Sequence, residues 1–173
     1  MAALGVLACS SRPGPGVRTS GTMLTGDSLV SAVHALGRSF GESRALIAAR
    51  LGPPLRAQVE AVPNRHVAAV DTAIGLWYTD AFFELLRSGA TGQEFLVGVE
   101  LWDSGRRLPG GLRIGSTVRR SAETVLGAFS EIHSSGDTAT LTYLWPPDGA
   151  EEDVMLRFVR DTLRAIGWAF YVD

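Results

Sequence analysis

The chain contains no lysine, and this absence removes several kinds of chemistry at once. All 16 of its basic residues are arginine. Schiff-base catalysis, covalent attachment of pyridoxal phosphate and the phosphate-binding lysine of a P-loop all require a lysine side chain. We therefore exclude these three mechanisms from the functions open to this protein.

The chain also has a single cysteine, a small net charge and no long apolar segment. Cys9 is the only cysteine, so neither an internal disulfide nor a zinc site with two cysteines can form within the chain. The formal charge of -2 is too small to predict binding to nucleic acid or to a membrane surface. No apolar run reaches the roughly 18 residues that span a bilayer. With 46% hydrophobic residues, the 173-residue chain has enough apolar material for one domain, or for two small ones sharing a core.

The segment 1–23 is predicted to be a truncated lipoprotein signal followed by a flexible tether. Its first nine residues are uncharged and mostly apolar, and the stretch after them contains several prolines and glycines and few core-forming residues. Ala8 directly before Cys9, with Val6 and Leu7 preceding it, resembles a bacterial lipoprotein processing site, in which the cysteine is lipidated. Since only eight residues precede that cysteine, fewer than a signal peptide needs, we expect translation to start upstream. The alternatives are a disordered N-terminus with an incidental cysteine and a transit peptide.

Two segments share one order of features, which predicts an internal repeat. Residues 37–53 and 111–128 each contain a hydrophobic residue before a glycine, then polar residues, then an amphipathic helix that ends in Leu-Gly. An Asp-Thr-Ala sequence and an aromatic strand follow each helix after a loop. Further strands are expected at 81–87 and 93–102 in the first copy, and at 154–158 and 168–172 in the second. Repeat one then occupies 24–110 and repeat two 111–173.

The ends of the repeated helices are marked by capping residues. Ser43 in the first copy and Ser116 or Thr117 in the second are expected N-caps, because their side-chain oxygens can accept from unpaired amides. Gly52 and Gly127 suit the left-handed conformation that closes a helix.

An additional helix is expected over residues 28–36, before the first copy. Asp27 is its expected cap and Gly37 its expected stop. The pattern as a whole predicts an α+β fold: two tandem helix-plus-antiparallel-meander repeats, with the helices packed on one face of the sheet.

The repeated unit resembles the BamE-like (SmpA/OmlA) outer-membrane lipoproteins. The resemblance rests on the paired glycines before each helix, the Leu-Gly stop and the aromatic strand, and it covers roughly residues 37–173. The tandem arrangement is similar to the beta-lactamase inhibitory protein fold, which carries two such repeats and has disulfides that this chain lacks. Inhibition of a beta-lactamase is therefore one function that the resemblance implies.

Recognisable catalytic and metal-binding patterns are absent from the sequence. His34, His66 and His133 have no metal-ligand spacing; we expect the first to pack on a helix and the other two to lie in loops. Nucleophile-elbow, Walker, dinucleotide and zinc-protease motifs do not occur. The acidic run at 151–153 is expected in a solvated hairpin loop. We predict no catalytic residue, no metal and no cofactor.

Aromatic residues on the strands are the best candidates for a binding surface. Alternate side chains point to opposite faces of a strand, so one helix-covered face cannot bury all of them. Those left on the open face would form a contact patch. The candidates are Trp77, Tyr78, Trp102, Tyr143, Trp145, Trp168, Phe170 and Tyr171.

Taken together, these features predict a non-catalytic binding module. The leading hypothesis is a lipid-anchored, periplasm-facing protein of the bacterial cell envelope, whose open sheet face binds another protein. The alternative is a small molecule or cell-wall fragment bound in a pocket between the repeats. A hydrolase with a site assembled by folding is a third hypothesis, and a cytoplasmic location is the alternative address. Neither a nucleic-acid partner nor a transmembrane span is expected.

Overall fold

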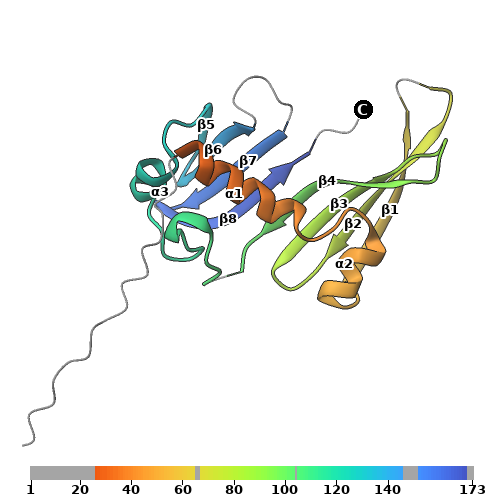
Figure 1. Ribbon diagram of the computed structural model, residues 1–173, viewed down its shortest axis with the longest axis horizontal. Helices are drawn as coiled ribbons and strands as arrows, with labels where there is room; N and C mark the ends of the chain where they lie inside the picture. The colour runs from red at the N-terminus through yellow and green to blue at the C-terminus, as the bar shows by residue number, and fades with distance from the viewer. Residues whose placement is uncertain (1–25, 65–66, 104, 146–151, 171–173) are drawn as a thin grey trace, which may run out of the picture.

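One antiparallel sheet of eight strands organises the molecule (Figure 1). The computed structural model describes residues 26–64, 67–103, 105–145 and 152–170. The strands are β1 (Arg56–Pro63), β2 (Val70–Trp77), β3 (Ala81–Arg87), β4 (Glu94–Leu101), β5 (Glu131–Ser135), β6 (Thr138–Trp145), β7 (Glu152–Val159) and β8 (Thr162–Ala169).

Two four-stranded meanders meet at a single seam. The strand order is β1-β2-β3-β4-β8-β7-β6-β5, so each half of the sheet follows chain order and the last strand of each half lies at the centre. At the seam, Gly98–Leu101 of β4 pair antiparallel with Ile166–Ala169 of β8. Strands β1 and β5 are therefore the two outer edges.

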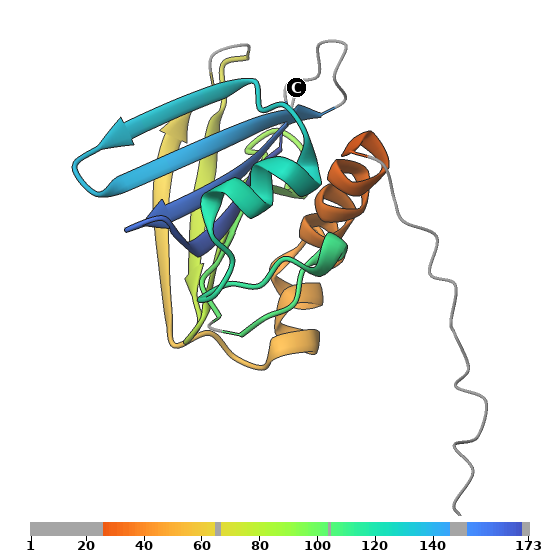
Figure 2. The same cartoon turned by 90° about the vertical axis from the view of Figure 1, so that its left-hand side faces the viewer.

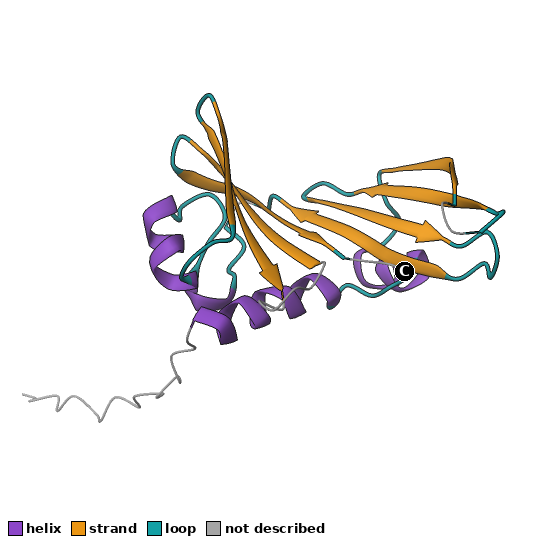
Figure 3. Cartoon of the chain, turned by 90° about the horizontal axis from the view of Figure 1, so that it is seen from above, coloured by secondary structure: helices purple, strands orange, loops and turns teal. Residues whose placement is uncertain are grey.

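The helices cover one face of the sheet and leave the other open (Figures 2 and 3). They are α1 (Gly26–Arg38), α2 (Arg44–Leu51), the short 3-10 helix η1 (Pro109–Gly111) and α3 (Arg119–Leu126). Although α1 comes first in the chain, it packs on β6, β7 and β8 and against α3. The α+β class and the antiparallel sheet predicted from the sequence are confirmed.

Strand alternation divides the side chains between a buried helix-side face and the open face. Phe83, Leu101, Leu156 and Trp168 point toward the helices and are essentially fully buried. Burial of each such side chain contributes about 1.5–3 kcal/mol. Their neighbours along the strands point to the open face, which is why the open side can carry polar and small residues.

Trp168 fixes the position of α1 over the seam. Its indole Nε1 donates a hydrogen bond of 3.0 Å to the carbonyl oxygen of Val33. Gly37 lies against the ring so closely that a Cβ there would sit 2.6 Å from the Cγ of Trp168. Gly37 is thus not the predicted stop: it lies inside α1, as does Asp27, and its small size is needed for this contact.

The predicted ends of the repeated helices are partly confirmed. Ser43 caps α2 by accepting from the amide of Leu46, and Gly52 closes that helix with a φ of 82°. Gly127 closes α3 with a φ of 85°. The predicted N-cap of α3 is wrong, because the helix begins after Val118 without a side-chain cap.

Thr117 instead uses its hydroxyl oxygen to accept from the Arg113 amide at 2.7 Å. This bond closes the turn before α3, and Thr117 Oγ1 does not cap the amides of the helix itself. Ser116, the other predicted cap, makes no capping bond because Val118 occupies the cap position.

The edge strands β1 and β5 were not predicted, because the sequence pattern assigns both segments to loops. His133, expected in a loop, lies on β5 opposite Thr140. The acidic run was also misplaced: Glu152 and Asp153 begin β7 and pair with β6, while Glu151 lies outside the described residues. His66 lies outside them as well.

Candidate binding surface on the open sheet face

The structure divides the predicted aromatic surface and places half of it in the core. Four of the candidates are buried on the helix side: Tyr78, Tyr143, Trp168 and Phe170. Burial, together with the nearby charge of Glu123, raises the pKa of Tyr143 to about 12. These four side chains are unavailable as a contact surface. The side chain of Trp145, all of Tyr171 and the predicted lipidation site Cys9 lie outside the described residues.

Trp77, on the open face, and Trp102, just beyond the end of β4, are both partly exposed. The ring of Trp77 lies on the ring of Phe82, with centroids 4.7 Å apart. The guanidinium of Arg56 covers Trp77 at 4.8 Å from its centroid, within the range of a cation–π contact. Trp102 donates its indole hydrogen to the carbonyl of Thr79 at 3.0 Å, which fixes its orientation at the end of β4.

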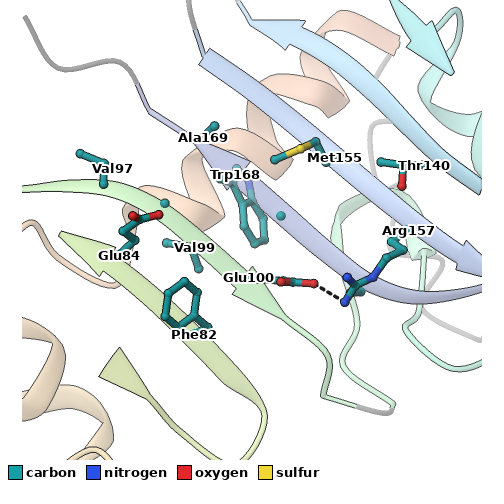
Figure 4. A pocket seen from close by; sticks show the side chains of 13 residues that line it. Phe82, Glu84, Val97, Val99, Glu100, Thr140, Met155, Arg157, Trp168 and Ala169 are labelled. Atoms are coloured by element: carbon teal, nitrogen blue, oxygen red, sulfur yellow. Dashed lines mark ion pairs between the residues drawn. The ribbon is translucent and has the colours of Figure 1, made fainter. Parts of the chain in front are cut away.

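A groove of about 330 Å³ crosses the open face above the seam, and we call it the seam groove (Figure 4). Its floor consists of Gly98, Ala165, Gly167 and Ala169. The strand register explains the hollow. Gly98 lies opposite Ala169 on β8, and Gly167 lies opposite Glu100 on β4. Because β4 and β8 present small side chains here, the longer side chains of β3 and β7 rise on either side.

The walls of the seam groove combine apolar surface with a few polar groups. Phe82 stands on the β3 side and Met155 on the β7 side. Glu100 forms an ion pair with Arg157 across the seam (Figure 4). The carboxylate of Glu84 also lines the groove, and it has no ion-pair partner among the residues that the structure describes.

The open face has an excess of carboxylates. The strand register places six acidic residues on it against three arginines, one of which is at the β8 bulge: Glu60, Asp71, Glu84, Glu100, Glu131 and Asp153 against Arg56, Arg157 and Arg164. Burial raises the pKa of Asp153, and the charge of Glu131 raises it further. A partner with basic groups would relieve this concentration of negative charge.

A second polar cluster lies on the opposite, helix-side face and joins α1 to β7. The Nε2 of His34 lies 2.5 Å from Oε2 of Glu152, and Arg38 pairs with the other carboxylate oxygen. The Arg38 guanidinium lies 4.6 Å from the centroid of Phe170, and His34 meets the same ring edge-on. Sequence reasoning missed this cluster because more than a hundred residues separate its members.

The two histidines that the structure describes are not brought together. His34 belongs to the helix-side cluster, and His133 lies on β5 at the far edge of the sheet. In the part of the chain that the structure describes, no three His, Cys, Asp or Glu side chains lie close enough to hold a metal ion. The seam groove presents apolar side chains and charged groups that can form hydrogen bonds, and such a lining is suited to binding a partner or ligand.

No family model, curated protein or solved structure matches this chain. Among the described helices, none combines the length and the apolar character required to cross a membrane.

Proposed function

We propose that this protein is a non-catalytic binding module that engages another protein through the seam groove and the open face around it. The observation that carries the proposal is the groove itself, which has a floor of glycine and alanine between apolar walls. A protruding side chain or loop of a partner could enter it and be desolvated against Phe82 and Met155. The partly exposed Trp77 and the unpaired Glu84 extend the contact area beside the groove.

The architecture that presents this face is proposed to be a tandem repeat. Each meander ends at the seam, and the strand order is the same when read from either edge toward the centre. Short helices closed by glycine, α2 and α3, precede the two meanders. These features support a duplicated helix-and-meander unit, as the resemblance to BamE-like proteins implies. Binding of a beta-lactamase is one specific version of the function.

The location that we propose is the bacterial cell envelope, with lipid attached at Cys9. The support comes from the sequence around that residue, where small and apolar residues precede the only cysteine. Labelling with a radioactive or alkyne-tagged fatty acid in cells would test it. Label lost on Cys9→Ala is the expected result, and an unlabelled chain would contradict the anchor.

The test of partner binding is to fill the groove without disturbing the fold. A Cβ at Gly167 would meet its nearest neighbour, the Cε of Met155, at 3.5 Å, which is ordinary van der Waals contact. Gly167→Gln therefore fits the backbone and projects into the groove. In a crosslinking capture from envelope extract, we expect a stoichiometric partner that this variant loses. Ser135→Gln on the exposed edge strand β5 is the matched control and should retain the partner.

A small ligand in the same groove is the second candidate. The volume of the seam groove lies at the lower end of the roughly 300–1,000 Å³ typical of ligand sites. The groove also lies between the two meanders, where a pocket for a small molecule is expected from the sequence. Fragments of peptidoglycan can be screened by NMR. Chemical-shift changes confined to the groove residues and abolished by Gly167→Gln would favour this function, whereas a protein captured without such shifts would favour the first.

A further inference from the structure

Strand β1 has the composition of a half-buried strand, although nothing in the described chain covers it. Leu55, just before the strand, and Ala57, Val59, Ala61 and Pro63 within it alternate with Arg56, Gln58 and Glu60; Val62 is the one apolar residue among the alternate positions. The pairing of Val59 with the buried Ile74 shows that the apolar set faces the helix side. Even so, all eight residues of β1 are exposed, Val59 at 61%, and Leu55 just before the strand is 75% exposed.

Exposed apolar residues gather around this strand. Most of the large exposed hydrophobic residues of the described chain belong to α2, to β1, to the segments on either side of β1 or to the first residue of β2: Leu46, Leu51, Leu55, Val59, Val62, Val67 and Val70. A concentration of this kind marks an interaction surface.

The outer edge of β1 is also a free strand edge. In an edge strand, every second residue directs its amide and carbonyl away from the sheet, where another strand can pair with them. The opposite edge differs: β5 has only five residues, and Ile132 is its single apolar side chain. Shortness and polarity protect β5 against pairing, whereas β1 is eight residues long; its proline, Pro63, lies only at the end of the strand, and its two charged residues are of opposite sign.

We propose that β1 pairs with β1 of a second copy, forming a two-fold dimer with a continuous sheet. The charges on the strand select both the occupant and the register. In antiparallel pairing centred on Gln58, Arg56 lies opposite Glu60 of the second copy, and Glu60 lies opposite its Arg56. Both ion pairs lie on the open face, because these residues share that face of β1. The strand is therefore complementary to itself in charge.

The apolar residues fit the same register. With Gln58 on the axis, Val59 lies opposite Ala57 of the second copy, and Leu55 lies opposite its Ala61. The two apolar stripes then adjoin on the helix side and cover one another. Pairing centred on Glu60 would place two carboxylates opposite each other, and pairing centred on Val59 would leave Arg56 opposite an aliphatic residue. The register centred on Gln58 satisfies the charges and the apolar stripe together.

The dimer is tested with the full chain by sedimentation velocity over a dilution series. We expect Arg56→Glu and Glu60→Arg each to weaken dimerisation at least roughly tenfold, because each replaces two attractive cross-strand pairs with repulsive ones. Combining the two substitutions should restore the dimer. Glu131→Arg, the matched change on the β5 edge, should leave it intact. A chain that is monomeric even at the highest concentration of the series would overturn the proposal. So would a dimer whose dissociation constant does not change on either charge reversal.

A disulfide test fixes the register independently. Residues opposite each other in antiparallel strands have Cα atoms about 4.5–5.5 Å apart, a separation that a disulfide can bridge. In a Cys9→Ala background, Gln58→Cys should therefore give a covalent dimer under mild oxidation, and His133→Cys on β5 should not. Equal crosslinking of both variants would show nonspecific collision and overturn the assigned edge. Both tests measure association between copies of the chain and not the capture of a partner in the seam groove, so failure of the dimer and failure of the proposed function are distinguishable.

Discussion

Replacing Gly37 with alanine is expected to destabilise the protein, although alanine is the better helix former. In a helix interior that exchange normally gains about 0.5–1 kcal/mol. Here the new Cβ would lie 2.6–2.7 Å from three ring carbons of Trp168, which is too close for real atoms. The ring is 1% exposed and bonded to Val33, so it can move only by disturbing the core.

Overpacking of this kind costs about 1–3 kcal/mol, and subtracting the helix gain leaves a net loss of about 1 kcal/mol, with an upper limit of about 2.5 kcal/mol. For a chain of this length, each kcal/mol corresponds to a fall in Tm of roughly 2–4 °C. Urea unfolding followed by far-ultraviolet circular dichroism measures the free energy of unfolding. Near-ultraviolet circular dichroism reports whether the environment of Trp168 has changed.

The matched control is Ala35→Gly, an exposed position in the same helix. It should lose about 0.5–1 kcal/mol and leave the near-ultraviolet spectrum unchanged. If Gly37→Ala instead raised stability by the amount that Ala35→Gly lowers it, the helix preference alone would account for both. The close contact between α1 and the indole would then be refuted.

Three further predictions concern carboxylates, each measured by urea unfolding against pH. Glu152→Gln should cost about 1–2 kcal/mol at pH 7, because it weakens the charge-assisted bonds to α1; unchanged stability would contradict that role. Burial alone would raise the pKa of Glu94, but bonds and charge from Arg44 outweigh it and lower the pKa below 4.5. Glu94→Gln should therefore destabilise the protein at neutral pH, with the difference disappearing as pH falls through that lowered pKa; a constant difference would contradict it. Asp153 has a raised pKa, so Asp153→Asn should be more stable than the parent at neutral pH, and its advantage should vanish below about pH 3.8; a loss of stability would show that the charge has a partner.

Local patterns were sufficient to predict the elements whose signals are local. The strand over 81–87 was predicted with the bounds that the structure has, and Ser43, Gly52 and Gly127 end their helices as expected. The missed strand β1 also had a signal, since apolar and polar residues alternate through it. Its prolines, Pro54 just before the strand and Pro63 at its end, are compatible with an edge strand.

The surface could not be predicted in the same way. Alternation shows that Trp77 and Tyr78 face opposite sides of β2, but only the positions of the helices decide which side is buried. The seam groove depends on the register between β4 and β8, which places Gly98 opposite Ala169. Likewise, the cluster of His34 with Glu152 joins the beginning of the described chain to its end. Such pairings are properties of topology and have no signature in neighbouring residues.

The packing of α1 on the last strands has a consequence for synthesis of the chain. Leu29, Val30 and Val33, which are buried in the folded protein, emerge from the ribosome long before the strands that cover them. The bond from Trp168 to Val33 spans 135 residues. Contacts so distant in sequence form slowly, and exposed apolar surface invites aggregation or chaperone binding in the meantime. The first helix therefore remains a hydrophobic nascent segment until β8 has been made, and completion of the sheet is what ends its exposure.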